Sequence, residues 1–138
     1  MDKIQADGLP LPQRYGAILT IIIGISMAVL DGAIANVALP TIATDLQASA
    51  ARSIWVVNAY QIAIVVSLLS LSFLGDMFGY RRIYKYGLVI FLFSSLFCAL
   101  SDSLEMLTLA RVAQGFGGAA LMSVNTALIR LIYPQRHL

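Results

Sequence analysis

The chain has 138 residues, of which 59% are hydrophobic and only 12% are charged, and its mean hydropathy is +0.84. A soluble domain carries about 25% charged residues, so this composition excludes an ordinary soluble globular protein. The net charge of +2 is too small to indicate a nucleic-acid-binding protein.

Four apolar segments, separated by short clusters of charged residues, are each long enough to cross a bilayer as a helix, which takes about 20 residues. They cover residues 17–39, 54–74, 83–101 and 104–132. Helices are expected because a lone strand would leave its backbone unpaired in lipid. The sequence therefore predicts an all-α membrane protein, with four transmembrane helices in contact with the lipid bilayer and no soluble domain.

The first segment carries a carboxylate inside an apolar run. Asp31 follows fifteen uncharged residues, and Asn36 is the next strongly polar side chain. A charge within the bilayer is costly unless it is paired or hydrated, which makes Asp31 a candidate functional residue in need of a partner. Gly24, Ala28 and Gly32 are spaced by four, and small residues at that spacing let another helix approach closely.

The second segment carries Asn58 and Gln61 on one polar stripe, and both are candidates for lining a cavity. It ends in the stretch GDMFGYRR, which joins it to the third segment. Asp76 lies near the end of a helix, where the dipole disfavours an anion, so it needs donors or cations. Arg81 and Arg82 are near in sequence. The expected turn is basic, short and rich in glycine, with Gly75 before it and Gly79 free to adopt a positive φ.

The fourth segment holds Arg111. Within the three spans that do not carry Asp31, Arg111 is the only basic residue that lies well inside a span. A spacing of three and four residues places Arg111 on a helical stripe that is polar or small in five of six positions. Two members of this stripe, Met122 and Asn125, together with Asn36 on the first segment, are further candidates for lining a cavity. The stripe consists of Arg111, Gln114, Gly115, Gly118, Met122 and Asn125.

Asp31 and Arg111 are expected at the same depth. At 1.5 Å per residue, each lies roughly 10–12 Å below the same surface, so they can pair if their helices are neighbours. A structural pair that only holds two helices together is one interpretation. The other is proton exchange, because desolvation favours a protonated carboxyl group whereas a nearby cation favours the ionised form.

Basic residues gather in alternate connections, which sets the expected orientation. The positive-inside rule places the side that carries these basic residues in the cytoplasm, together with both termini. The protein is expected in the inner, or plasma, membrane. Trp55 and Tyr84 fit interfacial anchors. The residues on the basic side are Lys3, Arg14, Arg81, Arg82, Lys85 and Arg136.

The chain has one cysteine, Cys98, and one histidine, His137, and no spacing typical of metal ligands. No phosphate loop, nucleophile elbow or zinc motif is present either. An enzyme, a metal site and an organic cofactor are therefore not expected.

Several stretches resemble motifs of the major facilitator superfamily. FLGDMFGYRR, residues 73–82, resembles the motif between the second and third helices of that family, although Ser72 and Met77 depart from it. LTLARVAQGFGGAA, residues 107–120, closely resembles the fourth-helix motif. LDGAIANVALP, residues 30–40, resembles the first-helix motif of the fourteen-span drug:proton antiporters, and SIWVVNAYQIA, residues 53–63, is similar to the start of the second helix in that branch.

The resemblance implies the N-terminal part of a proton-coupled exporter of drugs or other small lipophilic compounds, with the proton as coupling ion. Asp31 and Arg111 would take part in proton coupling, and the stretch 75–82 would stabilise or gate one conformation. The partners would be a small-molecule substrate, bound between two halves, and the remaining helices of a full-length transporter. YPQRHL, residues 133–138, is similar to the start of the loop into a fifth helix, so residues 1–138 would form a partial transmembrane domain.

Two alternatives remain open from the sequence. A complete small multidrug transporter of four spans, working as a dimer, fits the length and the carboxylate in the first span. A truncated fragment that does not transport is the other alternative.

Overall fold

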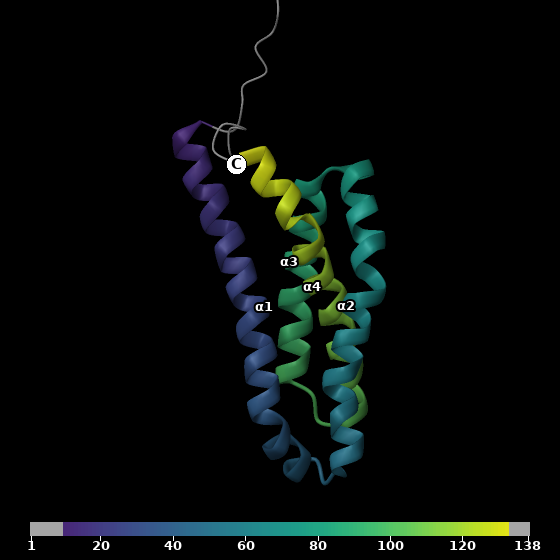
Figure 1. Ribbon diagram of the computed structural model, residues 1–138. Coiled ribbons are helices and arrows are strands. Elements are labelled where there is room, and N and C mark those ends of the chain that lie inside the picture. Colours follow the sequence, from purple (N-terminus) through teal and green to yellow (C-terminus); the bar gives the residue numbers. More distant parts are fainter. Residues whose placement is uncertain (1–9, 133–138) are drawn as a thin grey trace, which may run out of the picture.

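The computed structural model describes residues 10–132, which form a bundle of four long helices that run alternately up and down (Figure 1). The N-terminus of α1, the α2–α3 connection and the C-terminus of α4 lie at one end of the bundle (top in Figure 1), and the other two connections lie at the opposite end. The helices are α1 (Leu11–Asp45), α2 (Ala50–Phe78), α3 (Tyr80–Ala99) and α4 (Leu104–Ile132).

Helices α1 and α2 extend beyond the first two predicted segments at both ends, and α4 covers the same residues as the fourth. Helix α3 begins three residues before the third segment, 83–101, and ends two residues before its end, at Ala99. Helix α1 continues six residues past the predicted end at position 39, through Pro40, to Asp45. Proline removes one backbone hydrogen bond from a helix, and here that loss does not end α1. Short connections then follow, with the side chain of Ser49 accepting a hydrogen bond from the Arg52 amide at the start of α2.

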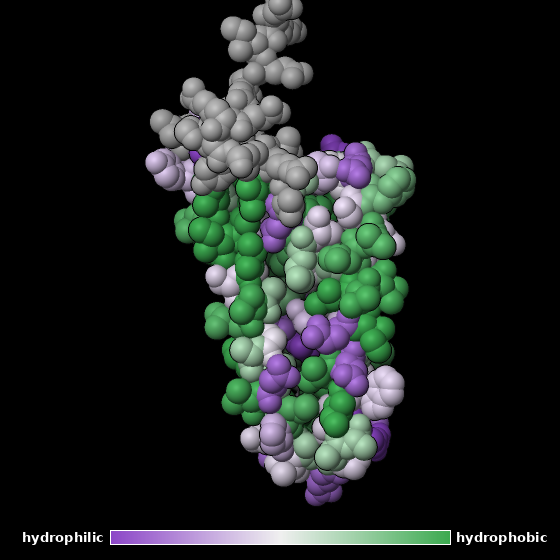
Figure 2. Space-filling model, viewed as in Figure 1, coloured by the Kyte–Doolittle hydropathy of each residue, from purple (hydrophilic) through white to green (hydrophobic). Residues whose placement is uncertain are grey.

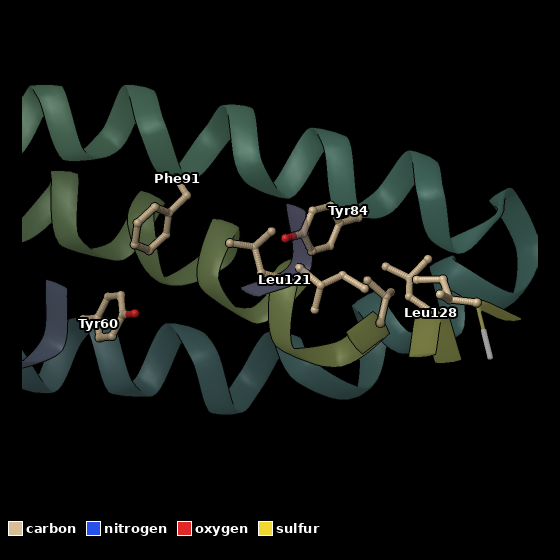
Figure 3. Close-up of a cluster of buried hydrophobic side chains, with 8 residues drawn as sticks. Tyr60, Tyr84, Phe91, Leu121 and Leu128 are labelled. Atoms are coloured by element: carbon tan, nitrogen blue, oxygen red, sulfur yellow. The ribbon is translucent and has the colours of Figure 1, made fainter. Parts of the chain in front are cut away.

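Helix α4 occupies the centre of the bundle and packs along both α2 and α3, whereas α1 contacts the other helices less extensively. Figure 3 shows Tyr60 of α2 and Phe91 of α3 pointing toward α4. Ala119, Leu121 and Val124 of α4 are at most 1% exposed. The buried core of the bundle is therefore built around α4.

The outer surface of the bundle is strongly apolar. Large hydrophobic side chains such as Val37, Leu69 and Leu109 are more than 70% exposed, and Figure 2 shows hydrophobic residues covering much of one face between its two ends. In water this surface would be unfavourable, whereas in lipid it needs no compensation. The surface therefore fits a protein surrounded by a bilayer.

Three of the described helices, α1, α2 and α3, are long and apolar enough to cross a membrane. Helix α4 is also long enough, at 29 residues, but it carries a buried arginine and glutamine and many small residues. The central position of α4 allows such polar residues, since a helix surrounded by other helices need not be apolar all round. A fourth span therefore stays a prediction.

Tyr84 was expected at the membrane interface, and that expectation is wrong. Its side chain is only 5% exposed, and its hydroxyl donates a hydrogen bond of 2.9 Å to the carbonyl of Thr20 on α1. The ring passes over Gly24, where an added Cβ would lie 2.1 Å from the Tyr84 hydroxyl oxygen. The small residue at position 24 thus lets α3 hold α1. Trp55, by contrast, is 59% exposed.

Candidate functional site

Asp31 of α1 is paired with Arg111 and Gln114 of α4. Nη1 of Arg111 donates to Oδ2 of Asp31 at 2.5 Å and to Oε1 of Gln114 at 2.7 Å. Nε2 of Gln114 donates to the other carboxylate oxygen of Asp31 at 2.8 Å. The three side chains therefore form a closed triangle of hydrogen bonds in which both carboxylate oxygens have a donor.

This triangle lies inside the bundle. The side chains of Arg111 and Asp31 are only 4% and 19% exposed, and Gln114 is fully buried. Asp31 and Arg111 lie level along the bundle, as predicted, because their side chains are in direct contact. Their depth below a membrane surface stays a prediction. Removing one partner of such a pair leaves the other charge buried without a counter-charge. This destabilises the protein far more than losing an ion pair at the surface does.

Two further side chains complete the surroundings of Arg111. The guanidinium carbon lies 4.1 Å from the centroid of the Tyr60 ring, a cation–π contact between α4 and α2. The thiol of Cys98 on α3 donates to Oε1 of Gln114 at 3.5 Å. Nε of Arg111 is buried and has no partner among the described residues. All four helices thus contribute a side chain to this site.

The glycines of α4 allow this close approach. A Cβ added to Gly115 would lie 2.7 Å from the Cβ of Ala63 and 2.8 Å from the carbonyl oxygen of Tyr60, so α2 contacts α4 where only glycine fits. A Cβ on Gly118 would lie 3.2 Å from the Tyr60 hydroxyl oxygen. The two glycines predicted from the stripe therefore position Tyr60 beside Arg111.

A pocket of about 390 Å³ opens between α1, α2 and α4, next to this triangle. Its walls are mostly apolar, and the uncharged polar groups on them come from three side chains: Tyr60, Gln61 and Asn125. The Oδ1 atom of Asn125 is buried and has no partner among the described residues. The lining residues are Ile25, Ala28, Val29, Gly32, Tyr60, Gln61, Ile64, Leu121, Met122 and Asn125.

Three of the five predicted cavity residues, Gln61, Met122 and Asn125, line this pocket, and the other two do not. Asn58 is exposed. It precedes Tyr60 by two residues, and two residues of an α-helix differ by about 200° in direction, which turns Asn58 away from the pocket. Asn36 is also exposed, one turn beyond Gly32 on α1. Neither Asn36 nor Asn58 lines this pocket, and that they line a cavity stays a prediction.

The stretch GDMFGYRR is not a loop but a single-residue break between two helices. Helix α2 runs through Asp76 to Phe78, and α3 begins at Tyr80. Gly79 alone separates them, with φ of +96°, so the positive φ predicted there is confirmed. Gly75 lies inside α2, where an added Cβ would be 3.0 Å from a methyl carbon of Val124 on α4.

Asp76 finds a different partner from the one that the sequence indicates. Its carboxylate accepts a hydrogen bond from the hydroxyl of Tyr80, four residues later. In the part of the chain that the structure describes, neither Arg81 nor Arg82 forms an ion pair with it, and both are exposed. Because the chain reverses at Gly79 without a loop, Tyr80 is brought next to Asp76 instead.

The sequence alone does not indicate the contact of Tyr60 with Arg111 or that of Cys98 with Gln114. Both Tyr60 and Cys98 lie on helices that flank α4, and no local pattern shows which aromatic ring or thiol faces a given arginine. The contact of Tyr80 with Asp76 gave no such signal either, because it forms across the break at Gly79 and not along one helix. Within residues 10–132, no group of three or more His, Cys, Asp or Glu residues could hold a metal ion.

A family model described as Major Facilitator Superfamily matches residues 21–138. An uncharacterized transporter of Escherichia coli K12, YebQ, is 89% identical over 138 residues, which are all of this chain and 30% of that protein. The riboflavin transporter RibZ of Clostridioides difficile is 34% identical over 90% of this chain and 27% of its own length. The multidrug export protein EmrB of Haemophilus influenzae is 35% identical over 89% of this chain and 25% of its own length. The chain thus spans less than a third of the length of these curated relatives.

Proposed function

Because this chain belongs to the major facilitator superfamily, a family of membrane transporters and not of enzymes, we propose that it is the N-terminal part of a proton-coupled exporter. The exported compounds are drugs or other small lipophilic molecules, and the coupling ion is the proton. The remaining helices of a full-length transporter complete the machinery, since the chain covers 30% of a relative that is 89% identical to it.

The observation that carries the proposal is the carboxylate of Asp31 inside the bundle, held by a cation and an amide. Burial favours the neutral form of a carboxyl group, while the Arg111 guanidinium and the Gln114 N–H favour the ionised form. Such opposed influences let a modest change in the surroundings move the proton on or off. A transporter that changes the hydration of this site between its two states therefore couples its motion to a proton.

The pocket supports the class of substrate. It adjoins the Asp31 triangle, is lined mainly by aliphatic side chains, and offers a few uncharged polar groups. This lining fits lipophilic compounds with isolated hydrogen-bonding groups better than strongly charged ones. Among the relatives, EmrB is a multidrug export protein, which is in keeping with that class.

The orientation follows from the charges at the two ends of the bundle. The described basic residues Arg14, Arg81, Arg82 and Lys85 lie at the end that holds the N-terminus of α1. Three carboxylates and one arginine lie near the opposite end: Asp45, Asp102, Glu105 and Arg52. The positive-inside rule then places the first end, and both termini, in the cytoplasm, with the protein in the inner membrane. Lys3 and Arg136, which entered the same prediction, lie outside the described residues, and so does the stretch YPQRHL, which entered the prediction of a loop into a fifth helix.

Family membership argues against the alternative of a four-span small multidrug transporter that works as a dimer. The match to the major facilitator model runs from residue 21 to residue 138 and includes the Asp31, Gly79 and Arg111 regions. No specific observation favours a second function.

The test is infrared difference spectroscopy on the full-length transporter in membranes, across pH, with Asp31→Asn to assign the carboxyl band. A band that is lost in Asp31→Asn and that titrates between about pH 5 and 9 is expected for a proton-exchanging carboxyl. Asp45→Asn is the matched control, since it makes the same change at the exposed end of the same helix. Asp31→Asn should also abolish transport driven by a pH gradient. An Asp31 carboxylate that stays ionised throughout would leave only a structural ion pair.

A further inference from the structure

Within the part of the chain that the structure describes, Tyr60 is the one side chain that both lines the pocket and stacks on the Arg111 guanidinium. Figure 3 shows its ring pointing from α2 toward α4. The ring is buried, with 6% exposed, and its hydroxyl end lies over Gly118 of α4. An occupant of the pocket that touches this ring therefore acts on a group that also contacts the arginine.

The ring is positioned to hold the guanidinium in place. Arg111 uses one nitrogen, Nη1, for both Asp31 and Gln114, and its Nε has no partner among the described residues. With so few hydrogen bonds fixing the plane of the guanidinium, the aromatic face supplies a further attraction of the cation–π kind. Moving or removing the ring loosens Arg111 and so weakens its hold on Asp31.

The other titratable groups around Asp31 do not provide this link. Arg111 from α4 is its ion-pair partner, and Cys98 from α3 reaches it only through Gln114. The remaining described carboxylates, Asp45, Asp76, Asp102 and Glu105, lie at or near helix ends. Among the described residues, Tyr60 from α2 is thus the only titratable or charged group in contact with this network that also lines the pocket.

We propose that Tyr60 is a positioning residue that transmits occupancy of the pocket to the Asp31–Arg111 pair. Contact of a lipophilic compound with the ring shifts the guanidinium and changes the pH at which Asp31 takes up its proton. This inference rests on the proposed proton role of Asp31 and adds the path by which the pocket reaches it.

The first experiment compares Tyr60→Phe with Tyr60→Leu in the full-length transporter, following the Asp31 carboxyl band across pH. Phenylalanine keeps the aromatic face, so the protonation midpoint of Asp31 should stay where it is in the parent protein. Leucine removes the face and should raise that midpoint by about half a pH unit, because a loosened arginine stabilises the carboxylate less. Equal midpoints in all three proteins, or a downward shift with leucine, would overturn the inference.

The second experiment places an occupant of known position in the pocket. Met122 lines the pocket one turn beyond Gly118, which lies under the Tyr60 hydroxyl. Met122→Cys, made in a Cys98→Ser background, is reacted with benzyl methanethiosulfonate so that a benzyl group occupies the pocket. Labelling should move the Asp31 midpoint when residue 60 is tyrosine or phenylalanine, and not when it is leucine. The same movement in all three would show that the occupant acts without Tyr60.

The two proposals fail in different ways. If the Asp31 band does not titrate in any variant, the proton role itself is wrong. If the Asp31 band titrates in the parent protein but its midpoint does not change with the residue at position 60, only the proposed role of Tyr60 is wrong.

Discussion

Gly117 of α4 lies directly against the backbone of Phe91 on α3. A Cβ added to Gly117 would be 2.6 Å from the Phe91 nitrogen and 2.9 Å from the carbonyl oxygen of Gly87. Both neighbours are backbone atoms, so no side-chain rotation relieves the clash. The contact between α3 and α4 therefore depends on a glycine at this position.

Gly117→Ala should destabilise the transporter by about 1–3 kcal/mol, because the two helices must separate to admit the methyl group. The measurement is thermal unfolding of the full-length transporter in detergent. Gly16→Ala is the matched control, since nothing lies within 4 Å of a Cβ at that position. It should leave stability unchanged or raise it slightly, because alanine favours the helix. Equal stabilities of the two variants would contradict the close contact.

The extent to which the sequence predicts the structure differs between the helices and the candidate site. Helix number and approximate position followed from apolar segment length. That Asp31 and Arg111 could pair followed from their depth, because a buried charge needs a partner and only one candidate was available, but that their helices are neighbours did not follow from the sequence. The glycine stripe on α4 followed from spacing. These features depend on local composition and on simple geometry along one helix axis.

The rest depends on how helices rotate about their axes when they pack. The inward direction of Tyr60 and Tyr84, and the outward direction of Asn58, are set by contacts between helices that no single segment encodes. The partner of Asp76 depends on the break at Gly79 being one residue long. A break of that length could not be distinguished from a short loop by composition alone.

Neutralising one member of the Asp31–Arg111 pair should cost more than neutralising both. Arg111→Met leaves the carboxylate with the Gln114 amide alone and should destabilise the protein by about 3–5 kcal/mol at a pH where Asp31 is ionised. Asp31→Asn combined with Arg111→Met removes both charges and should recover a large part of that loss. A double-mutant cycle from thermal unfolding of the full-length transporter measures the coupling energy. Purely additive effects would mean that the pair contributes nothing.

Gln114→Leu should make Asp31 hold its proton to a higher pH. The substitution removes the N–H that donates to the carboxylate, and this hydrogen bond stabilises the ionised form more than the protonated form. The infrared band of the Asp31 carboxyl group reports the midpoint. Gln61→Leu is the control, because Gln61 lines the same pocket and has no hydrogen bond to Asp31. A midpoint that rises equally in both variants would point to a general change in the polarity of the pocket.

Gly79→Ala should destabilise the junction between α2 and α3. The residue has φ of +96° and ψ of +129°, a conformation in which a Cβ is strained even though nothing lies within 4 Å of it. The expected cost is about 1–3 kcal/mol, and it arises from the backbone alone. Arg82→Ala is the control. Arg82 lies three residues later and its side chain is exposed, so this substitution should change the stability much less. The measurement is thermal unfolding of the two variants of the full-length transporter. If the Gly79→Ala protein is as stable as the Arg82→Ala protein, residue 79 adopts a negative φ at little cost in free energy.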